Sequence, residues 1–224
     1  MIMIQITQPT LDFLGKLKKN NDREWFAKNR GSYEAAKSEF EAFIQEVIKK
    51  ITDFDPILKG LEAKSCIYRI NRDTRFSNDK SPYKTNMGAF IVRGGRKNGV
   101  RFAGYYIHLE PGSCMVAGGA YMPPSPWLNA IREKIDSDPG EFIKIISDKS
   151  FRNSFGKLQG DKVKTTPKGY TSDNPNIDLL RHKSFLVMKD LKDKEVINPG
   201  FFKNVISMAM AMKPLNDYLN DCAD

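Results

Sequence analysis

The residues best suited to chemistry in this chain lie between Lys64 and Arg101. This segment holds ten basic and two acidic residues, a net charge of +8 in a chain whose total is +9. A local positive field attracts anions, whether phosphate, nucleic acid or an acidic protein face. Arginine supplies forked donors suited to phosphate or carboxylate, and lysine adds a flexible point charge. We therefore expect an anion-binding site built by Arg69, Arg72, Arg75, Lys80, Tyr83 and Lys84.

The same stretch also has a purely structural interpretation. Asp73 and Asp79 would pair with neighbouring arginines, and the aromatic rings would anchor a long connection to the core. The two carboxylates would suit a magnesium ion that accompanies phosphate, but the surrounding arginines favour ion pairing. Internal pairing and anion binding are compatible with each other.

Other chemistries have less support. The spacing S-x-x-K, which places a serine beside an activating lysine in some acyl-transfer enzymes, occurs at 77–80 and 81–84, but Pro82 interrupts the second match. With only two histidines, a site with several imidazole ligands is excluded. The three cysteines are too far apart for a zinc motif or a disulfide framework. We expect neither a metal nor a cofactor.

The two histidines differ in their surroundings. His108 is flanked by Ile107 and Leu109, so strand alternation places it on the opposite face, where a packed or solvent-facing histidine is expected. His182 lies between two basic residues that disfavour its charged form, and it would face the anion site if the chain folds that way.

The basic segment resembles the signature of the family known as domain of unknown function 2461. In that signature an RDTRFS stretch is followed by DK and then by PYKT, and this chain has the three pieces at 72–77, 79–80 and 82–85. The resemblance extends over nearly the whole chain and includes 21–30 and 182–185. It implies a shared fold and a shared site location, but it brings no activity, substrate or cofactor.

Helical patterns come first along the chain. Thr10 is expected to cap a helix that runs to about Lys19, and a short helix follows at Trp25. Apolar residues recur at helical spacing over 33–51, which predicts a longer helix that covers a sheet and ends by Asp55 and Pro56.

Short β-rich runs predict the sheet. Strands are expected at 66–70, 87–93, 100–110 and 113–121, and the last three should form an antiparallel meander. A long polar connection spans 71–86. A further strand at 185–188 returns to the sheet.

Helices close the chain after the meander. Ser125 is expected to cap one helix, and others follow at 139–147 and from Pro199 onward, with Pro214 as a kink or break. Together, the expected helices and strands predict a single α+β domain over 1–224, with a mainly antiparallel sheet and helices packed from the N- and C-terminal parts of the chain.

The composition limits location and function. No run approaches the roughly 20 apolar residues of a membrane span, and the start lacks the features of a signal peptide, so we expect a cytoplasmic protein with no membrane partner. The expected function is binding, or turnover, of a phosphorylated or other anionic small ligand. The alternatives are a nucleic-acid-binding module and a non-enzymatic protein-interaction domain.

Overall fold

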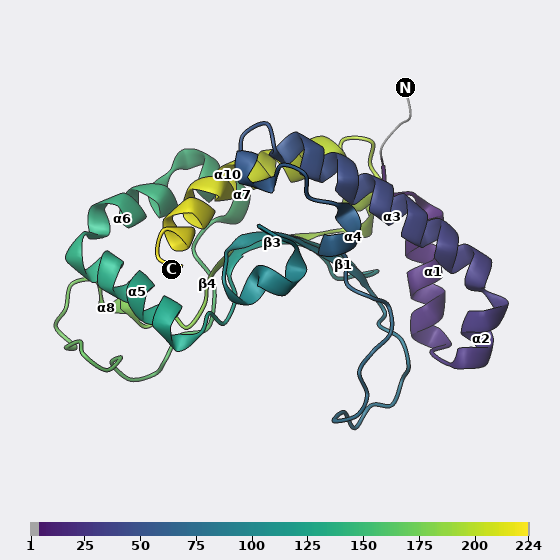
Figure 1. The fold of residues 1–224 in the computed structure, drawn as a ribbon, viewed down its shortest axis with the longest axis horizontal. Helices are drawn as coiled ribbons and strands as arrows, with labels where there is room; N and C mark the ends of the chain where they lie inside the picture. Colours follow the sequence, from purple (N-terminus) through teal and green to yellow (C-terminus); the bar gives the residue numbers. More distant parts are fainter. Residues whose placement is uncertain (1–4, 224) are drawn as a thin grey trace.

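The computed structural model describes residues 5–223 and contains a four-stranded sheet flanked by helices (Figure 1). The strands lie in the order β1-β2-β3-β4, and every neighbouring pair is antiparallel. The predicted meander and the returning strand are therefore confirmed. The strands are β1 (Met87–Ile91), β2 (Gly104–Leu109), β3 (Cys114–Ala120) and β4 (Phe185–Leu191).

Helices from both ends of the chain surround this sheet, which confirms the α+β fold class. The two longest are α3, close to its predicted range, and α10, which runs through Pro214 without a break. The helices are α1 (Gln8–Lys19), α2 (Arg23–Lys28), α3 (Arg30–Ile51), α4 (Ala63–Cys66), α5 (Ser125–Ser137), α6 (Pro139–Ser147), α7 (Lys149–Phe155), α8 (Ile177–Leu180), α9 (Asp193–Val196) and α10 (Phe201–Asn220), with the 3₁₀ turns η1 (Pro56–Leu58) and η2 (Arg96–Val100).

Helices α3 and α10 lie together on one side of the sheet (Figure 1). The residues that face them are buried. Of the residues between them along β1 and β2, Phe90, Tyr106 and His108 are only partly buried, as a two-residue alternation predicts, whereas the glycines at these positions are buried. Removing this much apolar surface from water is the main stabilising term of the fold. The buried face includes Ala89, Ile107, Val116 and Val187.

The predicted strand at 66–70 is wrong. Its first residue ends α4, and only Ile67 forms a β-bridge, with Ala89 of β1. Three residues later the chain turns away, because the carbonyl of Ile70 accepts a hydrogen bond from the amide of Lys84 instead of pairing with β1. Residues 67–70 therefore form a short edge beside β1 rather than a full strand.

Two predicted boundaries also differ. Helix α1 begins before Thr10, whose hydroxyl donates to the Glu39 carboxylate at 2.6 Å instead of capping the helix. The strand expected from Val100 begins only at Gly104, because η2 occupies the preceding residues.

Within residues 5–223 no helix is both long and apolar enough to cross a membrane. The start of the chain was expected to lack the features of a signal peptide. Its first four residues lie outside the described range.

Candidate functional site

The connection between α4 and β1 is a long hairpin that projects from the body of the protein (Figure 1). Its two arms pair with each other: the amide of Arg72 donates to the carbonyl of Pro82 at 2.9 Å, and the amide of Lys84 donates to the carbonyl of Ile70 at 2.8 Å. An isolated bridge between Asn71 and Tyr83 lies between these bonds. The base of the hairpin is therefore ordered by its own backbone.

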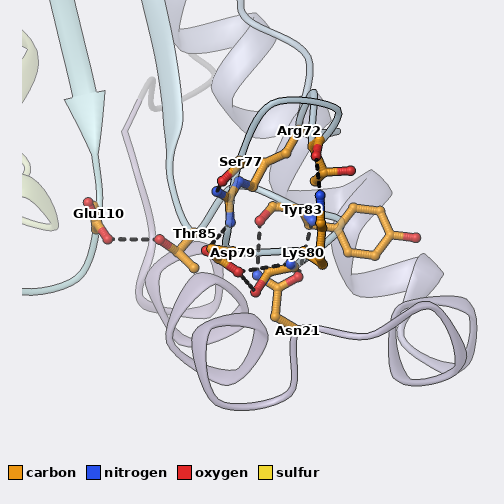
Figure 2. A network of polar contacts seen from close by, with 10 residues as sticks. Asn21, Arg72, Ser77, Asp79, Lys80, Tyr83, Thr85 and Glu110 are labelled. Atoms are coloured by element: carbon orange, nitrogen blue, oxygen red, sulfur yellow. Dashed lines mark hydrogen bonds and ion pairs between the residues drawn. The ribbon is translucent and has the colours of Figure 1, made fainter.

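Helix α2 and the residue before its cap hold this base in place (Figure 2). The Asn21 side chain donates to the Tyr83 carbonyl at 2.9 Å and accepts from the Tyr83 amide at 3.1 Å. The Tyr83 ring stacks on Phe26, with centroids 3.9 Å apart. Farther along, the Thr85 hydroxyl donates to Glu110, the residue after β2, at 2.8 Å. These contacts give Tyr83 an anchoring position.

The arginines at the hairpin tip pair with its aspartates (Figure 2 shows Arg72 and Asp79). Arg72 forms an ion pair with Asp79, and Arg75 pairs with Asp73 at 2.7 Å. The Lys80 ammonium donates to a backbone carbonyl, that of Thr74, at 3.1 Å. These pairs are mostly exposed, and each contributes little stability. They are the internal pairs of the structural interpretation.

Both tip carboxylates are occupied by hydrogen bonds within the hairpin. Bonds from the Ser81 side chain and amide, and then from Arg72, lower the pKa of Asp79 well below its usual range. The side chain and amide of Arg75 lower the pKa of Asp73. Across the described range 5–223, no three His, Cys, Asp or Glu side chains gather as a metal site would require.

A second group of basic residues lies at the base of the hairpin, around Tyr68. The Lys84 ammonium is 5.3 Å from the centre of the Tyr68 ring, and the Arg96 guanidinium is 5.9 Å from it. Such cation–π contacts hold cations beside an aromatic ring without neutralising them. We call this group the Tyr68 cluster, and its members are Lys64, Tyr68, Arg69, Lys84 and Arg96.

The turn after β1 positions Arg96. Gly95 has φ of +88°, and a Cβ there would lie 3.0 Å from the Ser65 carbonyl oxygen, so this close approach favours glycine. The same carbonyl accepts a hydrogen bond from Arg96 at 3.1 Å. The turn thereby brings a guanidinium from beyond β1 to α4 and to the Tyr68 ring that follows it.

Four members of the Tyr68 cluster line a pocket of about 320 Å³. Its opposite wall is the surface of α3, which contributes Tyr33, Lys37 and Glu41. The pocket therefore has four basic side chains and one acidic side chain, and Glu41 lies 4.0 Å from Lys37. The cluster members that line it are Lys64, Tyr68, Arg69 and Arg96.

The charges of the Tyr68 cluster are not neutralised by the protein. Burial, followed by the nearby charges of Arg69 and Arg96, lowers the pKa of Lys84. Within residues 5–223, no carboxylate lies within ion-pair distance of Lys64, Arg69, Lys84 or Arg96. Like charges held together without a counterion repel one another, and a bound anion relieves that repulsion.

A more open pocket of about 760 Å³ lies on the other side of the hairpin base. Arg72 and Lys80 line it, but so do Asp22 and Glu24. Its charges are mixed, and Arg72 is already paired. This pocket is less suited to an anion than the pocket of the Tyr68 cluster.

The structure thus divides the six candidate residues into two groups. Arg69 and Lys84 belong to the Tyr68 cluster, whereas Arg72, Arg75 and Lys80 make contacts within the hairpin and Tyr83 anchors it. The sequence analysis counted Lys64 and Arg96 among the charges but did not assign them to the site. It also missed the α3 wall, although Lys37 and Glu41 lie outside the apolar stripe of that helix.

His182 does not face the Tyr68 cluster. It is buried beyond α8, where its ring packs on Phe185 at the start of β4, the strand at the opposite edge of the sheet from β1. Burial, followed by the charge of Lys162, lowers its pKa to about 4. Its charged form is disfavoured as expected, but mainly by burial rather than by its sequence neighbours.

Acidification is therefore expected to destabilise the fold through His182. Below pH 6.5 the unfolded histidine takes up a proton, whereas the folded one stays neutral until about pH 4, so stability falls as the pH decreases through this window. The expected loss is about 2 to 3 kcal/mol. Urea unfolding at several pH values should show a shallower pH slope for His182→Gln, and equal slopes in the two proteins would contradict this assignment.

Comparison with known proteins gives one match. A family model described as "Conserved hypothetical protein (DUF2461)" matches residues 9–218. No curated protein and no solved structure matches the chain.

Proposed function

This chain belongs to the DUF2461 family, whose description names no activity, and from the geometry of the site we propose that it binds a phosphorylated or other anionic small ligand. The proposed site is the pocket of the Tyr68 cluster. Arg69 and Arg96 offer forked donors to phosphate oxygens, and Lys64 and Lys84 add point charges.

One observation carries the proposal: the cluster gathers four cations that have no carboxylate partner among residues 5–223. The hairpin tip has similar residues, yet its arginines are paired with aspartates. An ammonium whose pKa is lowered by burial and by neighbouring cations costs free energy to keep charged, and an anionic ligand offsets that cost. The pocket has room for a phosphate group and a small substituent.

In this proposal the hairpin has a supporting role. Its internal ion pairs and its anchor on Asn21 fix the position of Lys84, whose amide belongs to the base of the hairpin. Arg72, Arg75, Lys80 and Tyr83 would then act by ordering the hairpin. The ligand would contact Arg69 and Arg96, and the charge of Lys84 would act from beside the pocket.

A thermal-shift screen tests this function. The compounds are phosphate, pyrophosphate, sugar phosphates, nucleotides and short DNA and RNA oligonucleotides, with sodium chloride at matched ionic strength as the control. A ligand at about 100 times its Kd stabilises the folded state by about 2.7 kcal/mol. We expect a small phosphorylated compound to raise the melting temperature and chloride to leave it unchanged. No shift with any compound would contradict the proposal.

Nucleic acid is the second candidate, because basic and aromatic residues continue beyond the pocket. The guanidinium groups of Arg93 and Arg101 lie 5.4 and 5.6 Å from the centre of the Phe102 ring, and Phe76 is 97% exposed at the hairpin tip. Rings beside cations suit stacked bases along a single strand. In the same screen, stabilisation by oligonucleotides alone, falling steeply with salt, would favour this function.

A further inference from the structure

The two walls of the Tyr68 cluster pocket differ in charge. One wall carries the cations that line the pocket and that the proposed function assigns to phosphate: Lys64, Arg69 and Arg96. The other wall is α3, where the Lys37 ammonium lies 4.0 Å from the Glu41 carboxylate. Opposite charges this close act on a ligand as a weak dipole rather than as a net charge. A phosphate group is therefore held on the side of Arg69 and Arg96, away from α3.

The inner part of the pocket is apolar. Its buried lining residues are Phe40, Ile70 and Met87. Ile67 and the ring of Tyr33 are partly buried and complete this part of the lining. The cations of the cluster that line the pocket are exposed or only partly buried, so they lie nearer the mouth. Burial therefore orders the lining from an apolar floor to a charged mouth.

Aromatic rings border the apolar floor. Tyr33 packs on Phe26, with ring centroids 5.0 Å apart, and Phe26 stacks on Tyr83 at the base of the hairpin. Phe13 of α1 also lies against Tyr33, with centroids 6.0 Å apart. Tyr33 is thus a member of an aromatic cluster and also lines the pocket. Because aromatic rings pack favourably in offset or edge-to-face contact, a ligand ring beside Tyr33 would extend this cluster.

The ring of Tyr68 is held by a contact outside the pocket. It meets Tyr106 edge to face, with centroids 6.4 Å apart. The Tyr106 hydroxyl lies 2.8 Å from Nδ1 of His108, and Nε2 of His108 lies 3.3 Å from Oε2 of Glu110. These hydrogen bonds fix Tyr106, and Tyr106 in turn supports the Tyr68 ring. A side chain that is already ordered lowers the entropy cost of binding a ligand.

We propose that this pocket binds a phosphate monoester that carries one aromatic ring. The proposal rests on the anion-binding function above and names the class of ligand. The phosphate accepts hydrogen bonds from Arg69 and Arg96 at the mouth, and the ring lies on the apolar floor beside Tyr33. The volume of about 320 Å³ is at the lower end for small-molecule sites, which suits one ring and one phosphate group. A sugar ring fits less well, because its hydroxyls would lose hydrogen bonds to water on an apolar floor.

Three phosphate monoesters of equal charge test the proposal: methyl phosphate, phenyl phosphate and glucose 6-phosphate. They are titrated by calorimetry at constant ionic strength and about pH 8, where each is a dianion because the second phosphate pKa is about 6. We expect phenyl phosphate to bind about 10-fold more tightly than methyl phosphate, since its ring leaves water for an apolar surface. Glucose 6-phosphate should stay within about threefold of methyl phosphate, because desolvation of its hydroxyls offsets the burial of its ring.

A matched pair of variants locates the ring. Ile67→Thr keeps the branched Cβ and replaces an ethyl group of the pocket lining by a hydroxyl. It should weaken binding of phenyl phosphate about fourfold and leave the affinity for methyl phosphate unchanged. Ile57→Thr makes the same change at an exposed residue that does not line the pocket, and it should alter neither affinity. Equal effects of the two variants would overturn the placement of the ring.

The same titrations separate the inference from the proposed function. Equal affinities for the three esters would overturn the aromatic ligand and leave anion binding intact. The same conclusion would follow if glucose 6-phosphate bound as tightly as phenyl phosphate, or if pyrophosphate bound and phenyl phosphate did not. If neither pyrophosphate nor any of the esters bound, both proposals would be wrong.

Discussion

Changing Arg69 and Arg96 together to glutamine is expected to weaken pyrophosphate binding by about 30- to 100-fold. Hydrogen bonds to charged groups contribute about 1.5 to 3 kcal/mol each, and the exposure of Arg69 brings the expected total below the sum of two such bonds, to about 2 to 3 kcal/mol. Glutamine keeps much of the length of each side chain and removes the charge. Isothermal titration calorimetry at constant ionic strength measures the change.

Arg93→Gln with Arg101→Gln is the matched control, because it removes the same net charge from the basic segment. These two arginines lie against Phe102 and do not line the pocket. We expect this variant to lose less than about threefold in affinity, the size of a general electrostatic effect. Equal losses in the two double variants would show that net charge, and not the pocket, determines binding.

Gly119→Ala is expected to destabilise the protein by more than about 4 kcal/mol. Gly119 has φ of +110°, which side chains rarely adopt, and an added Cβ would lie 2.2 Å from the backbone oxygen of Phe185 on β4. Backbone strain and overpacking each cost about 1 to 3 kcal/mol. Neither cost is easily relieved, because the added Cβ meets the backbone of β4, which is hydrogen-bonded to β3. Urea unfolding, or the yield of folded protein, measures the effect.

Gly112→Ala is the comparison for this prediction. Gly112 also has a positive φ, +81°, but nothing lies within 4 Å of an added Cβ, so only the strain remains. We expect a loss of about 1 to 2 kcal/mol. Equal stabilities of the two alanine variants would contradict the close approach of the β3 and β4 backbones at Gly119.

Regular elements were predictable because burial leaves a periodic pattern in the sequence. The stripe over 33–51 marks α3, and the alternation around His108 correctly placed this residue on the face opposite Ile107 and Leu109. The four-residue helix α4 has no such pattern, since one helical turn is too short for its period to differ from that of a strand. This explains why α4 was not predicted, whereas the strand expected at 66–70 was wrong because the chain turns away from β1 at Ile70.

The location of the basic segment was predictable, but the arrangement of its charges was not. Arg69 and Arg72 are equivalent in type and close in sequence, yet one lines the pocket and the other pairs with Asp79. The difference depends on contacts between distant residues, such as the hydrogen bonds between Asn21 and Tyr83. No local pattern encodes such contacts.

Tyr106 and His108 alternate along β2 and Glu110 follows the strand at the same two-residue spacing, which was a usable signal in the sequence. Three polar side chains at alternate positions of a strand share one face, so their hydrogen bonding can be anticipated once the strand is assigned. Their proximity to Tyr68 depends on the pairing of the edge segment with β1, which the sequence does not specify.

The most direct test of the central claim is an NMR titration of the ¹⁵N-labelled protein with pyrophosphate, since amide shifts report where the anion binds. We expect the largest changes at the amides of the Tyr68 cluster, with smaller ones at Lys37 on α3. The hairpin tip around Arg75 should change little. Largest shifts at the tip, or shifts spread evenly over the basic segment, would contradict binding in the pocket of the Tyr68 cluster.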